Sequence, residues 1–261
     1  MALLDVNGIG ISFGGVKAVQ DVSFEVRKGQ IVSVIGPNGA GKTTLFNMLS
    51  GVYMPLQGEV KLKDEPVTGM EPHLLARRGM SRTFQNLQVF PAMTALENVA
   101  TGFHLQENGS LLADLLGLPS ARRRTKRSED QARELLDKVG LGRTADIEAG
   151  SLSYGTLKRL EIARALALKP DLLLLDEPAA GCNAVETEEI EHLIADVAAS
   201  GIAILLVEHD MKMVMRISNH IVVLDHGQKI AEGKPAEVSK HPRVIEAYLG
   251  AAATKEVAEY A

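Results

Sequence analysis

A short run of residues near the beginning of the chain combines a glycine-rich backbone with a lysine and hydroxyl groups. The run consists of Gly36, Pro37, Asn38, Gly39, Ala40, Gly41, Lys42 and Thr43, with Thr44 directly after it. Glycines let backbone N–H groups crowd around an oxyanion, and a helix N-terminus adds positive potential. In this pattern a lysine reaches the β and γ phosphates and a hydroxyl group ligates Mg2+. The run therefore predicts a nucleotide phosphate site, with Lys42 on the phosphates and Thr43 on the metal.

Two adjacent carboxylates follow an apolar run farther along the chain. Leu172 to Leu175 lead directly into Asp176 and Glu177. A strand that ends beside the phosphates would deliver both carboxylates to the nucleotide. We expect Asp176 to hold Mg2+, directly or through water, and Glu177 to polarise the attacking water. An isolated pair ahead of Pro178 would serve equally well as an acidic helix cap, but together with the phosphate site it predicts ATP hydrolysis.

The elements that must position these residues alternate between strand and helix. Apolar runs rich in β-branched or leucine residues occupy 31–35, 172–175, 203–207 and 221–224, and their near-continuous character is typical of parallel strands buried on both faces. Ile190, Leu193, Ile194 and Val197 form one apolar helical face between two of these runs. The pattern predicts an α/β fold with a mainly parallel sheet, in which the phosphate site joins the strand at 31–35 to a helix that begins near Lys42.

Two parts of the chain depart from this alternation. Residues 22–26 and 59–63 alternate apolar and polar side chains, which predicts an N-terminal antiparallel β subdomain. Helical patterns dominate from about Asn86 to Asp146, including a helix over about Ser128 to Val139, which predicts an inserted helical subdomain. We expect one unit over residues 1–250, with the α/β core and antiparallel part at 1–85 and 160–250, the helical subdomain at about 86–159, and a tail at 251–261.

Composition excludes several classes of protein. The chain has 261 residues and a net charge of −5, and its sequence pI near 5.8 argues against a broad nucleic-acid-binding face. No apolar run approaches the roughly 20 residues of a membrane-spanning helix, and residues 1–5 lack the features of a secretion signal. Cys182 is the single cysteine, so we expect a reducing compartment. The basic run at 122–127 fits a solvated helix start or a contact with lipid headgroups or a partner.

A further motif narrows the ATPase class. Leu152, Ser153, Tyr154, Gly155 and Thr156 stand shortly before the acidic strand and open a helical run at 157–168. This motif resembles the signature of ABC ATPases, whose commonest form is Leu-Ser-Gly-Gly-Gln, and departs from it at Tyr154 and Thr156. The resemblance implies that Ser153 and Gly155 bind the γ-phosphate held by the phosphate loop of an opposite subunit. Ser153 also fits an ordinary helix N-cap, and a capped helix end can bind an anion as well.

Other landmarks of the family follow in the same order. Gln85 resembles the Q-loop glutamine, which contacts Mg2+ and water, and His209 resembles the switch histidine, which contacts the γ-phosphate. Phe13 lies where the family places the aromatic that stacks on adenine, although a core or turn aromatic is an alternative there. Asn183 occupies the D-loop position that is usually aspartate, and with Glu186 it also fits a helix capping box.

Details point to a subgroup of these ATPases. The segments 82–86, 180–183 and 241–250 resemble the ATPases of branched-chain amino acid importers. A urea or amide importer ATPase and the lipopolysaccharide-export ATPase stay open as alternatives. A P-loop kinase would have no use for the signature motif. Soluble ABC ATPases that act on ribosomes or DNA usually carry two cassettes or long coiled coils, which this sequence lacks.

The resemblance also implies cofactors and partners. We expect ATP and Mg2+, a second ABC ATPase subunit that is identical or different, transmembrane permease subunits and, indirectly, a periplasmic or extracellular solute-binding protein, but no nucleic acid. The location would be peripheral, at the cytoplasmic face of the membrane. Permease contact is expected at residues 85–99, where an apolar group stands out: Leu87, Val89, Phe90, Pro91 and Met93. A small local core beneath Ala95, Leu96 and Val99 is the alternative explanation for that group.

Overall fold

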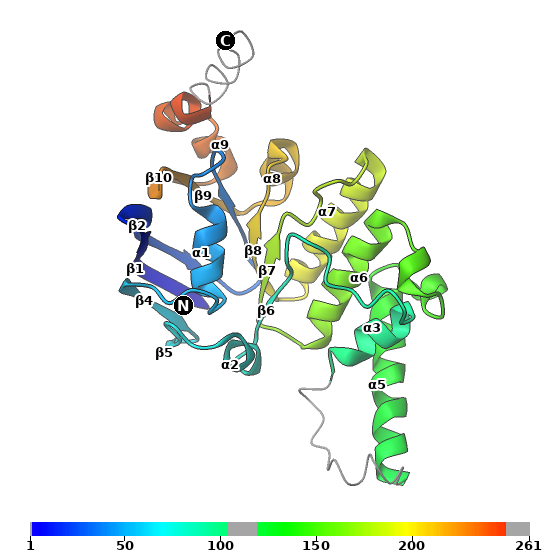
Figure 1. Ribbon diagram of the computed structural model, residues 1–261. Coiled ribbons are helices and arrows are strands. Elements are labelled where there is room, and N and C mark those ends of the chain that lie inside the picture. Colours follow the sequence, from blue (N-terminus) through cyan, green and yellow to red (C-terminus); the bar gives the residue numbers. More distant parts are fainter. Residues whose placement is uncertain (1, 104–118, 249–261) are drawn as a thin grey trace.

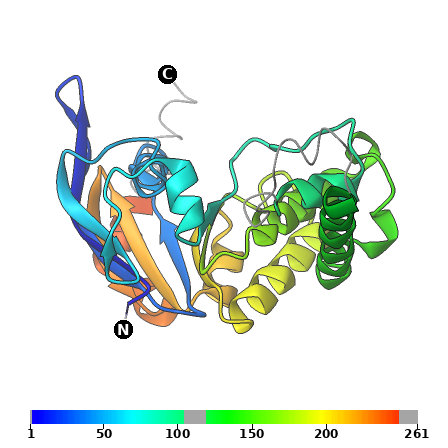
Figure 2. The same cartoon turned by 90° about the horizontal axis from the view of Figure 1, so that it is seen from below.

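The protein is described by a computed structural model that covers residues 2–103 and 119–248 (Figure 1). The expected tail at 251–261 lies outside the described residues. Strands and the first helix occupy one side of the molecule, and the helices of the expected helical subdomain occupy the other (Figures 1 and 2).

The larger sheet carries the functional segments. Within the described residues, its strands lie in the order β10-β9-β3-β8-β7-β6. Strands β3, β6, β7, β8 and β9 are parallel to their neighbours in this set, whereas β10 runs antiparallel to β9. The mainly parallel sheet predicted from the apolar runs is therefore confirmed. The bounds of its strands are β3 Ile31–Ile35, β6 Met80–Arg82, β7 Leu172–Asp176, β8 Ala203–Val207, β9 His220–Asp225 and β10 Gln228–Gly233.

The smaller sheet is antiparallel and N-terminal, as the alternating pattern predicted. In the part of the chain that the structure describes, its strands lie in the order β2-β1-β4-β5. Alternation along β1 and β2 places one set of side chains against the core, including Leu4, Val6, Val22 and Val26, and leaves the other set at the surface. The bounds are β1 Leu4–Phe13, β2 Val16–Val26, β4 Gln57–Leu62 and β5 Glu65–Pro66.

Helices pack against both faces of the larger sheet. Alternate leucines of β7 show this directly, because Leu172 and Leu174 pack with α1 and the smaller sheet, whereas Leu173 and Leu175 pack with α6 and α7. Each such buried leucine contributes on the order of 1.5–3 kcal/mol relative to an exposed one. The helices are α1 Lys42–Leu49, α2 Pro72–Arg77, α3 Ala95–Thr101, α5 Pro119–Lys138, α6 Tyr154–Ala167, α7 Ala184–Ala199, α8 Met211–Ile217 and α9 Pro235–Val238, with 3-10 turns at Gly142–Thr144 and Ala149–Ser151 and helical residues at 242–248.

One helix boundary differs from the sequence expectation. Helix α5 begins at Pro119 rather than near Ser128, so the basic run lies within the helix and not at its start. The stretch after Pro119 contains no glycine or proline up to Lys138, and arginine, lysine and alanine favour helix, so nothing in it stops helix propagation. Proline is tolerated in the first turn because its missing N–H would have no intrahelical partner there.

Helices α3, α5 and α6 form the helical part of the molecule. They share an apolar cluster with α7, and α6 continues without a break through the boundary expected near residue 159. In Figure 2 these helices, in green, lie on the side of the molecule opposite to the smaller sheet, in blue. Within the described ranges, no helix has the length and apolar character needed to span a bilayer.

Candidate active site

The glycine-rich loop occupies residues 36–41, between the end of β3 and the start of α1. Two of its glycines are required by their surroundings. A Cβ atom on Gly36 would lie 2.1 Å from the Leu224 carbonyl oxygen, and one on Gly41 would lie 2.5 Å from the Ala18 carbonyl oxygen. Gly41 also has φ +100°, which side chains disfavour. The loop therefore presents bare backbone at the N-terminus of α1, which is the arrangement that binds phosphate.

Lys42 is held over this loop. Its Nζ atom donates hydrogen bonds to the carbonyl oxygens of Gly36, at 2.7 Å, and Pro37, at 3.0 Å. Burial lowers the pKa of the Lys42 ammonium, while the nearby carboxylates of Glu177 and Asp176 raise it. A buried ammonium that is held by carbonyl oxygens keeps its positive charge available for the negative charge of a phosphate.

A cleft of about 570 Å³ opens beside the loop. Its lining joins the glycine-rich loop and the start of α1 to three side chains that the sequence places far away: Gln85, Glu177 and His209. The described lining residues are Val16, Lys17, Ala18, Asn38, Gly39, Ala40, Gly41, Lys42, Thr43, Thr44, Gln85, Glu177, His209, His226 and Gly227. Most of the site residues expected from sequence therefore meet in one cleft.

Glu177 lies at the centre of the polar contacts in this cleft. Gln85 Nε2 donates to Glu177 Oε2 at 3.1 Å, and His209 Nε2 lies 2.6 Å from Glu177 Oε1. The backbone N–H of Glu177 donates to the Val207 carbonyl oxygen at 2.9 Å, and its φ of +51° is unusual for a residue with a side chain. The Glu177 side chain is only 13% exposed. Its carboxylate is thus fixed in the lining of the cleft, where it could act as a general base for water.

Asp176 and Thr43 supply oxygen ligands of the kind that Mg2+ prefers. The Asp176 carboxylate is buried at the end of β7 and bonded to Arg82, whereas Thr43 is exposed at the first turn of α1. Mg2+ bound with a nucleotide usually takes a few protein oxygens and completes its shell with phosphate oxygens and water. The residues present therefore fit a nucleotide-bound Mg2+ ion, with Thr43, Asp176 and Gln85 as its candidate protein contacts.

Ser153 and Gly155 lie at a different helix end. Ser153 is the N-cap of α6 and accepts a hydrogen bond from the Thr156 backbone N–H at 3.3 Å. Glu186, which forms a capping box with Asn183 at the start of α7, packs so close to Gly155 that an added Cβ would lie 2.4 Å from its Cδ atom. Neither Ser153 nor Gly155 is among the described residues that line the cleft of the same chain.

Comparison with known proteins identifies the family. The profile described as ABC transporter matches residues 19–180. The chain belongs to the ABC transporter family, whose ATP-binding cassettes hydrolyse ATP. A second profile, described as branched-chain amino acid ATP-binding cassette transporter, matches residues 228–254. The family resemblance, the fold class and the ATPase activity expected from the sequence are thereby confirmed.

Curated relatives cover nearly the whole cassette. It is 45% identical over 251 residues to BraF of Pseudomonas aeruginosa, a high-affinity branched-chain amino acid transport ATP-binding protein, covering 96% of this chain and 98% of the relative. Identity to LivG of Escherichia coli, with the same description, is also 45%, with the same coverage. The lipopolysaccharide export ATP-binding protein LptB of Acidithiobacillus ferridurans is 38% identical, over 89% of this chain and 90% of the relative.

Solved structures show the same fold. The ADP conformation of an ATP-binding cassette of an ABC transporter superposes with a TM-score of 0.84 at 34% identity, covering 96% of this chain and 99% of that one. A dimeric cassette in a post-hydrolysis state, bound to ADP and Pi, superposes with a TM-score of 0.72 at 27% identity, covering 89% and 98%.

Phe13 stays a prediction as the adenine-stacking residue. Its ring is 45% exposed and packs edge-to-face on Tyr53, with ring centroids 5.3 Å apart. The neighbouring Val16, on β2, does line the cleft. Phe13 therefore ends β1, three residues before a residue of the cleft lining, and is partly exposed.

Helix α6 contacts the cleft through residues that the sequence did not single out. Lys158 is buried, and its Nζ atom donates to the carbonyl oxygens of Gln85, at 3.3 Å, and Glu177, at 3.4 Å. Glu161, three residues later, accepts from the backbone N–H groups of Phe84 and Gln88. Burial raises the pKa of the Glu161 carboxyl, and Lys158 lowers it. The helix that begins at the signature motif thus holds the backbone on both sides of Gln85.

Glu208 is a second residue that sequence reasoning missed. It is buried beside His209 and accepts from the backbone N–H groups of Ala179, at 2.8 Å, and His209, at 2.9 Å. Burial raises the pKa of its carboxyl, and the backbone hydrogen bonds from Ala179, His209 and Asp210 lower it. Glu208 thereby ties the loop after β7 to the loop after β8. The sequence feature that could have pointed to Glu208 is its position directly before His209.

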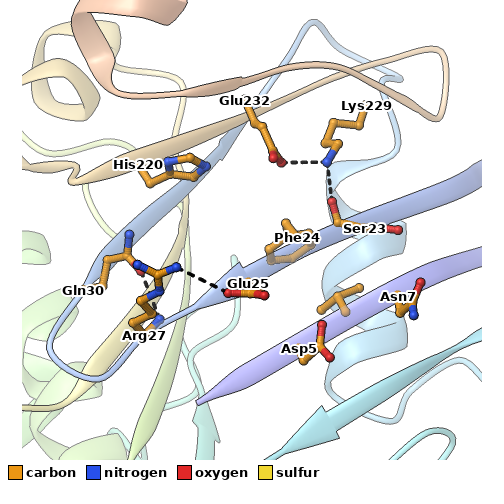
Figure 3. A pocket seen from close by; sticks show the side chains of 11 residues that line it. Asp5, Asn7, Ser23, Phe24, Glu25, Arg27, Gln30, His220, Lys229 and Glu232 are labelled. Carbon is orange, nitrogen blue, oxygen red and sulfur yellow. Dashed lines mark hydrogen bonds and ion pairs between the residues drawn. The ribbon is translucent and has the colours of Figure 1, made fainter. Parts of the chain in front are cut away.

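Another hollow, of about 460 Å³, lies between β1, β2 and the β9–β10 hairpin (Figure 3). Four of its charged side chains are bonded within the protein: Lys229 contacts Glu232 and the Ser23 carbonyl oxygen, and Arg27 contacts Glu25 (Figure 3). None of the residues expected to bind nucleotide is among its described lining. We therefore assign the chemistry to the cleft at the glycine-rich loop.

Proposed function

We propose that this chain is the ATP-hydrolysing subunit of an ABC importer for branched-chain amino acids. The observation that carries the hydrolytic assignment is the fixed Glu177 carboxylate, which contacts both Gln85 and His209 in the cleft that contains Lys42. The transport assignment is supported by the 45% identity to BraF and LivG over nearly the whole length of each protein.

Each side chain of the cleft has a proposed role in hydrolysis. Lys42 and the backbone N–H groups of the loop bind and orient the β and γ phosphates. Glu177 accepts the proton of the attacking water, and His209, whose Nε2 atom lies 2.6 Å from Glu177 Oε1, would contact the γ-phosphate. Mg2+ held near Thr43, Asp176 and Gln85 would supply charge neutralisation on the phosphate oxygens.

The active site is proposed to be shared between two cassettes. Ser153 and Gly155 form a capped helix N-terminus, a site that favours an anion, yet they stand outside the cleft of their own chain. A second cassette would bring its α6 end to this cleft and complete the phosphate site. The dimeric post-hydrolysis structure among the neighbours is consistent with this arrangement.

Permease contact is proposed at the segment that follows Gln85. Phe90 is 48% exposed and Met93 is 37% exposed, so these side chains are not the centre of a local core. The segment is nevertheless firmly held, because Asn98 bonds both the N–H and the carbonyl group of Phe90. The cassette would then sit at the cytoplasmic face of the membrane, bound to permeases that receive amino acids from a periplasmic or extracellular binding protein.

Export of lipopolysaccharide is the second candidate, because LptB is 38% identical over most of the chain. Two observations favour import. Identity to BraF is higher, at 45%, and the C-terminal profile at residues 228–254 is that of branched-chain amino acid transporters. Urea or amide import stays open as a variant of the same importer subgroup.

Uptake of labelled leucine, isoleucine and valine tests this proposal. In a strain lacking the gene, we expect the wild-type chain to restore uptake and the Glu177→Gln chain to fail, since the losses on removing a positioned base are about 10²- to 10⁴-fold. Labelled urea and acetamide serve as competing substrates in parallel assays. Restored urea or amide uptake without leucine uptake would overturn the amino acid assignment, as would a lipopolysaccharide defect with normal leucine uptake.

A further inference from the structure

An arginine to which the sequence analysis assigned no role in the site joins the end of β7 to helix α1. Arg82 is the last residue of β6, and its Nη2 atom lies 2.9 Å from Asp176 Oδ2 on the neighbouring strand β7. Its Nη1 atom donates to Asn47 Oδ1 at 2.8 Å and to Ser50 Oγ at 2.6 Å. One guanidinium therefore ties the carboxylate at the metal site to helix α1, which begins at Lys42.

Packing holds this guanidinium in a single place. The Arg82 side chain is 8% exposed and that of Asp176 is 4% exposed. The Arg82 Cζ atom lies 5.0 Å from the ring centre of Phe84 and 5.8 Å from that of Phe46. Arginine suits such a site because its planar fork presents several donors in fixed directions and packs well against aromatic faces. A lysine could keep the charge but not all three contacts.

We propose that Arg82 is a positioning residue for the Mg2+ site: it fixes the orientation of the Asp176 carboxylate, which would hold the metal. The inference rests on the proposed function, in which Asp176 serves the nucleotide-bound metal. Groups that hydrogen-bond to a metal-binding carboxylate orient it, and their loss typically costs about 10- to 100-fold in metal affinity or activity. Because Gln85 lies three residues after Arg82 on the same strand and loop, the same contact also aligns the start of that loop with Asp176.

A competing explanation is that Arg82 only neutralises a buried carboxylate and stabilises the fold. Breaking a buried ion pair by removing one partner is destabilising in general, so loss of stability alone does not separate the two roles. The effect of Mg2+ on nucleotide affinity distinguishes a role in the metal site from a role in stability alone. An arginine that acts on the metal through Asp176 changes that effect, whereas an arginine that only supports the fold does not.

The experiment measures the affinity for a fluorescent ADP analogue with excess Mg2+ and with EDTA, and takes the ratio of the two affinities. For Arg82→Met we expect this ratio to fall about tenfold or to reach unity, as for Asp176→Asn. Arg82→Lys should give an intermediate ratio. In the Asp176→Asn background, Arg82→Met should cause no further change, because the two residues would act on the metal as one unit. The matched control is Arg133→Met, which breaks another Arg–Asp pair at 2.9 Å, an exposed one, and should leave the ratio unchanged.

Two results would overturn the inference. One is a folded Arg82→Met protein, verified by circular dichroism, that keeps the wild-type ratio. The other is a fall in the ratio that persists in the Asp176→Asn background. If Arg82→Met does not fold, Arg82→Lys decides alone, and a wild-type ratio in that variant counts against the proposal. A wild-type protein with no Mg2+ effect at all would instead overturn the metal site of the proposed function.

Discussion

At the scale of single residues, Glu177 carries the largest share of the proposed chemistry. It occupies a left-handed backbone position, with φ +51°, directly after the buried Asp176. Such a conformation costs on the order of 1–3 kcal/mol in a residue with a side chain and persists only when surrounding contacts fix it. Here the backbone bond to Val207 and the side-chain contacts with Gln85 and His209 provide that support.

Glu177→Gln should bind ATP and hydrolyse it very slowly. Glutamine keeps the size of the side chain but cannot accept the proton of water, so turnover should fall by about 10² to 10⁴. Steady-state phosphate release and nucleotide binding, both on purified protein, are the measurements. Glu232→Gln is the control, since Glu232 pairs with Lys229 on the β10 strand and lies outside the cleft lining. Near-normal turnover in Glu177→Gln would rule out this base.

Sequence predicted some site residues and missed others for a physical reason. Lys42, Asp176 and Glu177 belong to contiguous motifs in which local backbone geometry determines the chemistry, so residue type and spacing are sufficient. The role of Arg82 depends on Asp176, which lies 94 positions away in the chain. Lys158 likewise acts on Gln85 across 73 positions. Only the pairing of β6 with β7 and the packing of α6 bring these groups together.

At the scale of elements, the chain between β6 and α3 combines firm backbone contacts with exposed apolar side chains. Glu161 and Lys158 of α6 hold the backbone on either side of Gln85, and Asn98 of α3 holds Phe90. The Phe90 ring also lies 5.4 Å from the Arg164 guanidinium of α6. A surface that is apolar, exposed and rigidly supported is suited to bind a partner rather than to fill a core.

Phe90→Asp or Met93→Asp should weaken permease binding without unfolding the cassette. Half-exposed side chains give up little burial energy when replaced, while a carboxylate would face an apolar partner surface without compensation. The measurements are co-purification of the permease from membranes, leucine uptake and ATP binding. Val89→Asp is the contrasting variant, because Val89 packs against the helical core and its replacement should lower the melting temperature. Normal assembly and uptake in the Phe90 and Met93 variants would place the docking surface elsewhere.

Sequence patterns predicted which helices and strands exist more accurately than the residues at which they begin and end. The buried strands at 31–35 and 203–207 coincide with β3 and β8, because an apolar run bounded by polar residues defines a doubly buried strand on its own. The predicted start of α5, near Ser128, was wrong because the basic run before it has no periodic apolar face. The residues of that run nevertheless favour helix as strongly as those that follow. Apolar periodicity reports burial, and it does not show where a solvated helix begins.

At the scale of the whole molecule, the parts proposed to bind phosphate lie in two places. The cleft gathers the loop at the end of β3 and the residues that follow β6, β7 and β8, because the carboxyl ends of parallel strands meet at one edge of a sheet. The capped end of α6 at Ser153 contributes nothing to the described lining of that cleft. An isolated chain therefore offers a cleft without its signature residues, and the account requires a second chain to complete it.

The concentration dependence of ATP turnover tests this requirement most directly. Phosphate release per chain, measured on the purified protein over a dilution series, should fall in proportion to concentration once the series passes below the dimerisation range. A mixture of Lys42→Ala and Ser153→Arg chains, each inactive alone, should recover part of the turnover, because one heterodimer keeps at most one intact composite site. Turnover per chain that stays constant on dilution, in a protein shown by sedimentation to be monomeric, would contradict the shared active site.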